Sequence, residues 1–232
     1  MIRARDAERG MRSERPDTGN PPGADPTAGS GSELRAPHSA PRAPLIVVSG
    51  PSGVGKTTVV DRLLAGSNLS LRRAVTATTR EQRPGEKDGT DYYFWGVGEF
   101  RKADEDGRML ESALVFGRDY YGTPRSEVDP YRAQGKGVIL VIDVQGAARV
   151  RELCPDCLSV FIAPPSFEEL EARLRGRRDM SEERIQRRLD TAREELTRVG
   201  EFHHRIVNRD LTEAVTALEH VIRERFNQLE RL

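Results

Sequence analysis

A glycine-rich segment, Gly50-Pro-Ser-Gly-Val-Gly-Lys-Thr57, constrains the fold of this 232-residue chain more than any other feature. It matches the pattern G-x-x-x-x-G-K-[ST] at every fixed position. An apolar, largely β-branched run at residues 45–48 precedes it, and a helical pattern follows from Lys56 to about Ala65. Strand, glycine loop and helix in this order open a parallel sheet with helices packed on it. The chain is therefore predicted to be an α/β protein.

The residue types of this segment suit the binding of phosphate groups. Glycines let successive backbone N–H groups turn inward around an anion, and the N-terminus of the following helix adds partial positive charge. Lys56, one of only four lysines in the chain, provides an ammonium group for the β- and γ-phosphates, and the Thr57 hydroxyl can reach Mg²⁺. We expect ATP, with Mg²⁺, to bind through the following residues: Gly50, Pro51, Ser52, Gly53, Val54, Gly55, Lys56 and Thr57.

The composition narrows the class of protein. The formal net charge is +0, which argues against a general binder of nucleic acid or anionic lipid. No apolar run reaches the ~18–20 residues that a membrane helix needs, and no signal peptide is evident. Cys154 and Cys157 lack further zinc ligands at suitable spacing, which favours a structural role over a metal or redox site. We expect a cytoplasmic protein that binds neither nucleic acid nor membrane; its oligomeric state, monomer or dimer, stays open.

Residues 1–43 differ in composition from the rest of the chain. They are rich in Arg, Asp, Glu, Pro, Gly and Ser and contain almost no large apolar side chains. Such a segment cannot bury enough surface to offset the entropy of ordering it. We therefore expect a disordered tail over residues 1–43 and one folded domain over 44–232.

Later segments continue the α/β pattern. Residues 138–142 and 158–163 are apolar runs typical of buried parallel strands. Between about residues 75 and 123, Thr, Tyr and Phe alternate with turn signals such as Pro84-Gly85, which predicts short, mostly antiparallel strands inserted into the sheet. Helices are predicted at about residues 147–153, from the capping box at Ser166-Phe-Glu-Glu169, after Ser181 to about Val199, and at about 213–229.

Several further segments stand in a fixed order along the chain: Thr78-Thr-Arg-Glu-Gln-Arg-Pro-Gly-Glu86, Asp91-Tyr-Tyr-Phe94, Glu111, Tyr120-Tyr-Gly-Thr-Pro124, Ile142-Asp-Val-Gln-Gly146, Ala163-Pro-Pro-Ser166, Arg173-Leu-Arg-Gly-Arg177 and Val207-Asn208. In order and spacing they resemble the motifs of guanylate kinases, a family of P-loop nucleoside monophosphate kinases, over about residues 44–230. The resemblance implies ATP-dependent phosphorylation of GMP, and of dGMP, in purine nucleotide metabolism and GMP recycling.

The same resemblance implies how the domain is divided. A core at residues 44–76 and 124–232 would form the central parallel sheet with flanking helices. A small mixed α/β region at about 77–123 would bind GMP, and a helical lid would lie at about 173–190.

Two arginines and two tyrosines suit the phosphate of a nucleoside monophosphate. Arg80 and Arg83 lie three residues apart beside a Pro-Gly turn, so that two guanidinium groups can hold the phosphate oxygens. Tyr92 and Tyr121 can add hydroxyl donors, and the resemblance implies that all four contact the phosphate. By spacing alone, a solvated charged loop with two core tyrosines explains these residues equally well.

A carboxylate suits the recognition of guanine, which presents N–H donors at N1 and N2 beside the O6 acceptor. The resemblance implies that Glu111 accepts from both donors and that Thr76, Thr123 and Asp143 are further base contacts. A site built on such polar groups should reject a base that lacks the partners by ~10⁴-fold or more.

The resemblance also assigns a lid that closes over ATP. Arg173, Arg177 and Arg188 flank a loop between two predicted helices and would bring positive charge to the transferring phosphoryl group. Asn208 would lie near the adenine. Without the phosphate-binding loop, a solvated basic helix face would explain these arginines about as well.

The sequence departs from the family at one principal position. Val141 stands two residues before Asp143, where the family usually has an acidic residue that helps to order the metal or its waters. Weaker turnover or a differently held metal is expected. Milder departures occur at Thr76, Gln82, Ser112, Leu114, Thr123 and Arg178.

Two alternative functions are weighed against the kinase. A guanylate-kinase-like module without catalytic activity would use the GMP cleft for protein ligands, but such modules are expected to lose Lys56 or the glycines around it. A related kinase could phosphorylate another phosphorylated acceptor, such as a ribose phosphate. Glu111 and the two tyrosines favour a purine nucleotide over that acceptor.

Overall fold

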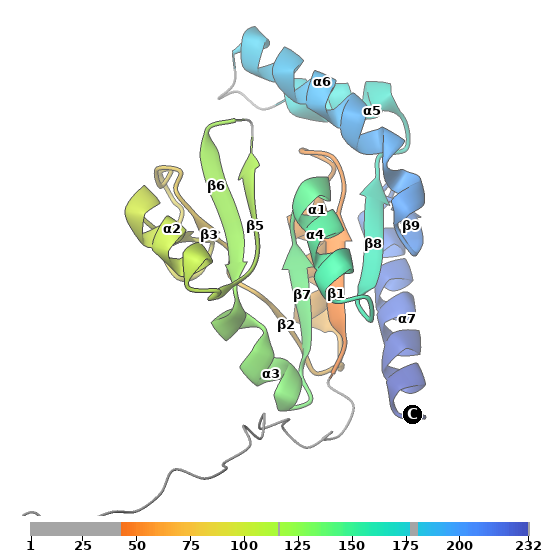
Figure 1. The fold of residues 1–232 in the computed structure, drawn as a ribbon. Coiled ribbons are helices and arrows are strands. Elements are labelled where there is room, and N and C mark those ends of the chain that lie inside the picture. The colour runs from red at the N-terminus through yellow and green to blue at the C-terminus, as the bar shows by residue number, and fades with distance from the viewer. Residues whose placement is uncertain (1–42, 116, 177–180, 232) are drawn as a thin grey trace, which may run out of the picture. The chain divides into compact units, whose positions relative to one another are not determined.

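The computed structural model describes residues 43–115, 117–176 and 181–231. Its central sheet has five parallel strands in the order β2-β7-β1-β8-β9 (Figure 1). The strands are β1 (Leu45–Ser49), β2 (Leu71–Arg73), β7 (Gly137–Val141), β8 (Leu158–Ala163) and β9 (His204–Val207). The buried strands expected near residues 45, 138 and 158 are confirmed.

The central strands β1 and β8 are buried at every position. A parallel strand covered on both faces must be apolar throughout, which explains the unbroken runs LIVVS and LSVFIA. Neighbouring residues of β1 point to opposite faces, so Ile46 and Val48 belong to one apolar cluster whereas Leu45 and Val47 belong to another.

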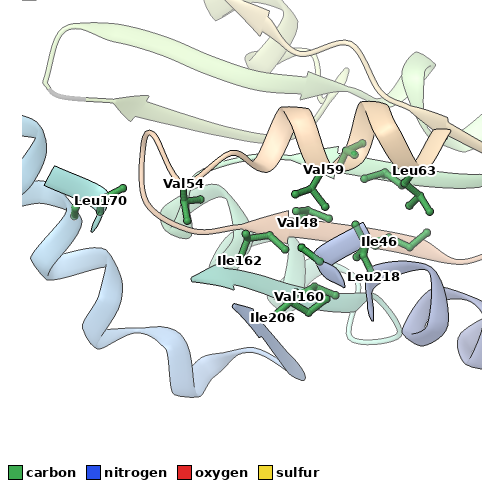
Figure 2. Close-up of a cluster of buried hydrophobic side chains, with 14 of the residues drawn as sticks. Ile46, Val48, Val54, Val59, Leu63, Val160, Ile162, Leu170, Ile206 and Leu218 are labelled. Carbon is green, nitrogen blue, oxygen red and sulfur yellow. The ribbon is translucent and has the colours of Figure 1, made fainter. Parts of the chain in front are cut away.

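Helices cover both faces of this sheet. Figure 2 shows the first cluster, in which Val59 and Leu63 of α1 (Lys56–Gly66) and Leu218 of α7 (Leu211–Leu229) lie over the sheet. In the second cluster, Ala147 and Val150 of α4 (Val144–Leu153) pack with residues of β1 and β7. The remaining helices are α2 (Val97–Glu105), α3 (Asp129–Ala133), α5 (Phe167–Arg175) and α6 (Glu182–Thr197), with 3₁₀ turns at Arg125–Glu127 and Val199–Glu201.

A second, four-stranded sheet has the order β4-β3-β6-β5. Its strands are β3 (Ala77–Thr78), β4 (Tyr93–Phe94), β5 (Met109–Val115) and β6 (Asp119–Pro124). The pairs β5–β6 and β3–β6 are antiparallel, as expected, whereas β3 and β4 pair in parallel. The expectation that these strands are inserted into the central sheet is wrong, because within the described residues they pair only with one another and form a sheet of their own. Helix α2 packs Phe100 and Ala103 against Met109 and Ala77. The small mixed α/β region expected within the fold is thus present.

Helix starts follow the capping residues of the sequence. The Ser166 hydroxyl accepts from the Glu169 N–H at 3.2 Å, and the Ser181 hydroxyl caps α6 in the same way. Helix α4 begins at Val144, earlier than the predicted residue 147, because the Asp143 carboxylate caps its first turn. Strands β2 and β9 are not evident from the sequence, because both are short and only Ile206 of their residues is buried.

Some sequence expectations fall at the margins of the described chain. The tail expected over residues 1–43 lies outside it, except for Ala43, which is buried and accepts a hydrogen bond from Arg132 Nε at 2.8 Å. Across the described ranges, no helix is both long and apolar enough to cross a membrane. Cys154 and Cys157 are free thiols, and burial raises the pKa of Cys157 to about 11, which suits a structural role.

Candidate active site

The loop between β1 and α1 has the backbone shape of a phosphate cradle. Gly50, Gly53 and Gly55 have φ angles of 136°, 88° and 97°, a region that residues with a side chain rarely adopt. At Gly50 a Cβ atom would also lie 2.1 Å from the Ile162 carbonyl oxygen of β8. The glycines are therefore required by the backbone conformation and, at Gly50, by the close approach of β8.

Lys56 begins α1 and lies over this loop. Its Nζ donates to the carbonyl oxygens of Gly50 and Pro51, at 2.5 and 3.0 Å. Burial lowers the pKa of Lys56, and the nearby carboxylates of Glu195 and Asp143 partly oppose that shift. The first turn of α1 contains no acidic residue, and Thr57 is exposed there. The site thus joins an ammonium group and a helix N-terminus, which together suit an anion.

The expected lid arginines contact the same loop. Helices α5 and α6 lie beyond the carboxyl ends of β1 and β8 (Figure 1). Arg173 of α5 donates to the carbonyl oxygen of Val54 at 3.5 Å and to that of Asn208 at 3.1 Å. Arg188 of α6 donates to the Ser52 hydroxyl at 3.1 Å. Arg177 lies outside the described residues.

Asn208 is buried against the phosphate-binding loop. Its Nδ2 donates to the Val54 carbonyl oxygen at 2.8 Å, and its backbone N–H donates to Ala163 at the end of β8. A Cβ on Gly55 would lie 2.7 Å from Asn208 Nδ2. In this structure Asn208 therefore braces the loop backbone.

Glu195 of α6 is a site residue that sequence reasoning missed. It is 8% exposed, its carboxylate accepts the Ser52 backbone N–H, and its Oε2 is buried without a hydrogen-bond partner. Burial raises its pKa to about 7, although the Lys56 ammonium acts in the opposite direction. The only signal in the sequence was an acidic residue at the spacing of the buried face of α6, two turns after Arg188.

Arg80 is the most buried of the residues that are expected to bind the phosphate of GMP. It is 7% exposed and donates to the Tyr121 hydroxyl at 3.2 Å and to Glu86 Oε1 at 2.8 Å. Burial by itself would lower its pKa, but these hydrogen bonds and charges outweigh burial and raise it. The alternative of a solvated charged loop is therefore excluded for Arg80.

The two predicted tyrosines lie beside this guanidinium group. The Arg80 Cζ is 5.4 Å from the centre of the Tyr92 ring, and the Tyr92 and Tyr121 rings meet edge to face at 5.9 Å. Burial raises the pKa of Tyr92, so its hydroxyl stays protonated and can donate. Arg83 is exposed at the adjoining turn, where its backbone N–H donates to Glu86 Oε2 at 2.8 Å. Glu86 thus accepts hydrogen bonds from both residues, from the Arg80 guanidinium group and from the Arg83 backbone.

Glu111 and Thr123 occupy paired positions of β5 and β6. The Thr123 hydroxyl donates to Glu111 Oε1 at 2.7 Å, in a site where Glu111 is 5% exposed. Burial raises the pKa of Glu111 to about 7; the hydrogen bond from Thr123 opposes this shift, and the charge of Asp143 adds to it.

The other two residues expected to contact the base, Asp143 and Thr76, make hydrogen bonds within the protein. Asp143 Oδ1 accepts from the backbone N–H groups of Gln145 and Gly146, at 2.7 and 2.9 Å. The Thr76 carbonyl oxygen accepts from the Tyr93 N–H at 2.9 Å, just before β3. Because the charge of Asp143 acts on both Lys56 and Glu111, Asp143 connects the two halves of the site electrostatically. Val141, where an acidic residue was expected, packs against the apolar core.

Comparisons with known proteins show which family this chain is similar to. The family model described as guanylate kinase matches residues 42–225. The chain is 48% identical to the guanylate kinase of Nostoc sp. over 175 residues, which is 75% of this chain and 87% of that protein. It is 43% identical to the guanylate kinase of Streptococcus thermophilus over 188 residues, 81% of this chain and 90% of that protein.

A solved structure is similar as well. The crystal structure of guanylate kinase from Anaplasma phagocytophilum matches with a TM-score of 0.66 at 32% sequence identity. The match covers 80% of this chain and 87% of that one.

Proposed function

This chain belongs to the guanylate kinase family and phosphorylates GMP with ATP, and on that premise we propose which of its residues perform each part of the reaction. The observation that carries the proposal is the placement of Tyr121 and Thr123 on β6. They are two residues apart on one strand, so their side chains point to the same face, where one joins Arg80 and the other joins Glu111. The residues proposed to bind the phosphate and the carboxylate proposed to recognise guanine thus lie side by side.

On the donor side, the loop from Gly50 to Thr57 holds the phosphates of ATP. Left-handed glycines and the free N-terminal turn of α1 fit a triphosphate, and Lys56 supplies a mobile positive charge. Mg²⁺, when bound with ATP, neutralises charge on the phosphate oxygens. Thr57 is the residue that would hold it, because its hydroxyl is exposed in the first turn of α1, directly after Lys56. Asn208 contributes by bracing the loop near the adenine.

On the acceptor side, Arg80, Arg83, Tyr92 and Tyr121 hold the phosphate of GMP. Guanidinium groups match the geometry of phosphate oxygens, and Glu86 fixes the orientation of Arg80 before the substrate arrives. Glu111 accepts from N1–H and N2–H of guanine, with Thr76, Thr123 and Asp143 completing the base site. Because all these groups contact base and phosphate, dGMP is expected to be a substrate too.

The transfer itself requires positioning more than covalent chemistry. The phosphate of GMP is already ionised, so no general base is needed. Lys56, Arg173 and Arg188 stabilise the negative charge of a loose transition state as the lid at about residues 173–190 closes. Arg177 joins them in this proposal.

The proposal extends to the organisation of the chain. Residues 44–232 are proposed as the catalytic domain, with a core at 44–76 and 124–232 and a GMP-binding insert at about 77–123; the tail expected over residues 1–43 lies outside the described residues except for Ala43. We propose that the protein acts on small molecules in the cytoplasm. Because its positive and negative charges balance, we do not expect it to bind nucleic acid or membranes.

A coupled assay of GDP formation tests these roles. The wild-type protein should convert GMP and ATP to GDP and reject AMP. Glu111→Gln should raise the KM for GMP and lower the preference for GMP over AMP by ~10²-fold or more, with the KM for ATP unchanged. A protein that binds GMP without forming GDP would support the interaction module, and equal turnover of a ribose phosphate would support the related kinase. If Glu111→Gln leaves GMP kinetics unchanged, Glu111 does not recognise the base.

A further inference from the structure

Gly146, the third residue of α4, lies against the carboxylate of Glu111. A Cβ atom on Gly146 would stand 2.9 Å from Glu111 Oε2 and 3.5 Å from its Cδ. Gly146 is buried within a regular helix and is not among the glycines with positive φ. Its backbone conformation therefore does not require glycine, whereas the present position of the Glu111 carboxylate does.

The opposite side of the same carboxylate is also fixed. Thr123 donates its hydroxyl to Oε1 at 2.7 Å from β6, and Glu111 is 5% exposed. Helix α4 and strand β5 pack directly on each other. The carboxylate is thus held between a hydroxyl on one side and the bare helix backbone of α4 on the other.

We propose that Gly146 is a specificity-determining positioning residue, which lets α4 approach the Glu111 carboxylate closely enough to fix it where it reads guanine. The inference rests on the proposed role of Glu111. Gly146 itself touches no substrate in this scheme and acts only through Glu111.

A Cβ atom at Gly146 should affect protein stability and the recognition of guanine differently. The atom that a Cβ would meet is the far end of a flexible side chain, so the fold can adapt by moving the carboxylate a few tenths of an ångström. Alanine also favours a helix more than glycine does. Recognition is less tolerant, because binding groups must be held within about 0.5 Å of their productive position. Gly146→Ala should therefore spare stability and impair the reading of guanine.

The matched experiment compares Gly146→Ala with Gly98→Ala. Gly98 is also near the start of a helix, α2, but a Cβ there would meet nothing within 4 Å. We expect Gly146→Ala to raise the KM for GMP about tenfold and to lower the preference for GMP over AMP, while the KM for ATP changes less than about twofold. Its thermal midpoint should stay equal to wild type or rise by ~2–4 °C. Gly98→Ala should leave all kinetic values unchanged.

A Glu111→Ala background separates this inference from the assignment of Glu111. With the carboxylate removed, adding Gly146→Ala should cause no further loss of GMP use. If Gly146→Ala is harmless while Glu111→Ala impairs GMP use, the inference is overturned and the proposed function stands. If Glu111→Ala itself leaves GMP use unchanged, the proposal that Glu111 recognises guanine is wrong. Equal, additive losses in both backgrounds would show that Gly146 does not act through Glu111.

Discussion

The Thr123 hydroxyl donates to Glu111 Oε1 over 2.7 Å, and neither side chain is more than 5% exposed. A carboxylate in such a site is costly to ionise, and burial raises the pKa of Glu111 to about 7. Only the ionised form can accept from both N–H donors of guanine. The hydrogen bond from Thr123 favours that form and leaves the carboxylate close to its midpoint at neutral pH.

The recognition of GMP should therefore depend on pH near neutrality. Because the carboxyl group becomes protonated below about pH 7, kcat/KM for GMP should fall as the pH is lowered, approaching tenfold for each pH unit. It should level off above pH 8. The measurement is kcat/KM for GMP at saturating ATP from pH 5.5 to 9.

The control for this profile is Glu111→Gln. The phosphate of GMP also titrates near pH 6, and the variant retains that contribution while losing the one near pH 7. A wild-type profile that matches the Glu111→Gln profile in shape would contradict the prediction.

Arg80→Lys should impair GMP binding although the charge is kept. The guanidinium group of Arg80 donates to Tyr121, to the Glu81 carbonyl oxygen and to Glu86 at the same time, and an ammonium group cannot reproduce that planar geometry. We expect the KM for GMP to rise ~10- to 100-fold and the unfolding free energy to fall by about 1 kcal/mol. Arg118→Lys is the matched control, because Arg118 is 78% exposed beside Asp119. Equal effects of the two variants would refute the assignment.

Glu195→Gln should lower turnover through Lys56. The amide keeps an acceptor for the Ser52 N–H but removes a buried charge that acts on the Lys56 ammonium. Without that charge, only Asp143 opposes the effect of burial on the pKa of Lys56, so the ammonium is less stable and kcat should fall about tenfold or more. Glu194→Gln, one residue earlier and exposed, should stay within about twofold of wild type. Steady-state kinetics with both substrates saturating decide the matter, and an unchanged kcat in Glu195→Gln would show that only the hydrogen bond matters.

Gly50→Ala should damage both the fold and the binding of ATP. The new Cβ would lie 2.1 Å from the Ile162 carbonyl oxygen, and the φ of 136° is unfavourable for alanine. Because backbone cannot move aside as a side chain can, we expect the unfolding free energy to fall by at least ~2 kcal/mol. Gly66→Ala at the end of α1, where a Cβ meets nothing within 4 Å, should be neutral. Urea titration of both variants tests this, and a fully stable Gly50→Ala protein would argue against the tight contact with β8.

Local features could be predicted because the residues that specify each of them are neighbours in the sequence. The glycine loop at residues 50–57 follows a buried strand and opens a helix, and Ser166 and Ser181 cap helices at the expected positions. These patterns depend on backbone dihedrals and on hydrogen bonds between near neighbours. Short elements such as β2 and β9 escaped prediction because their pairing partners, not their own residues, make them strands.

The residues of the candidate site likewise differ in whether local sequence could predict them. Spacing alone left Arg80 undecided between a solvated loop and a phosphate grip, and only the contacts from Tyr121 and Glu86 showed that it is buried and oriented. Glu195 was not found, because its spacing on the buried face of α6 is the one local feature that separates it from the exposed Glu194, and that spacing does not say which loop the face meets.

By itself, the sequence determined the parallel α/β core, the phosphate-binding loop and, through its resemblance to one family, the reaction. Tertiary structure alone decided that Gly146 lies against the Glu111 carboxylate and that α6 brings Glu195 to the loop at Ser52. Those relationships join residues far apart in the chain, and they depend on how closely a helix and a strand approach when the core is packed. Residue patterns specify local backbone, whereas the distance between two side chains from separate elements is fixed only by the packing of the whole domain.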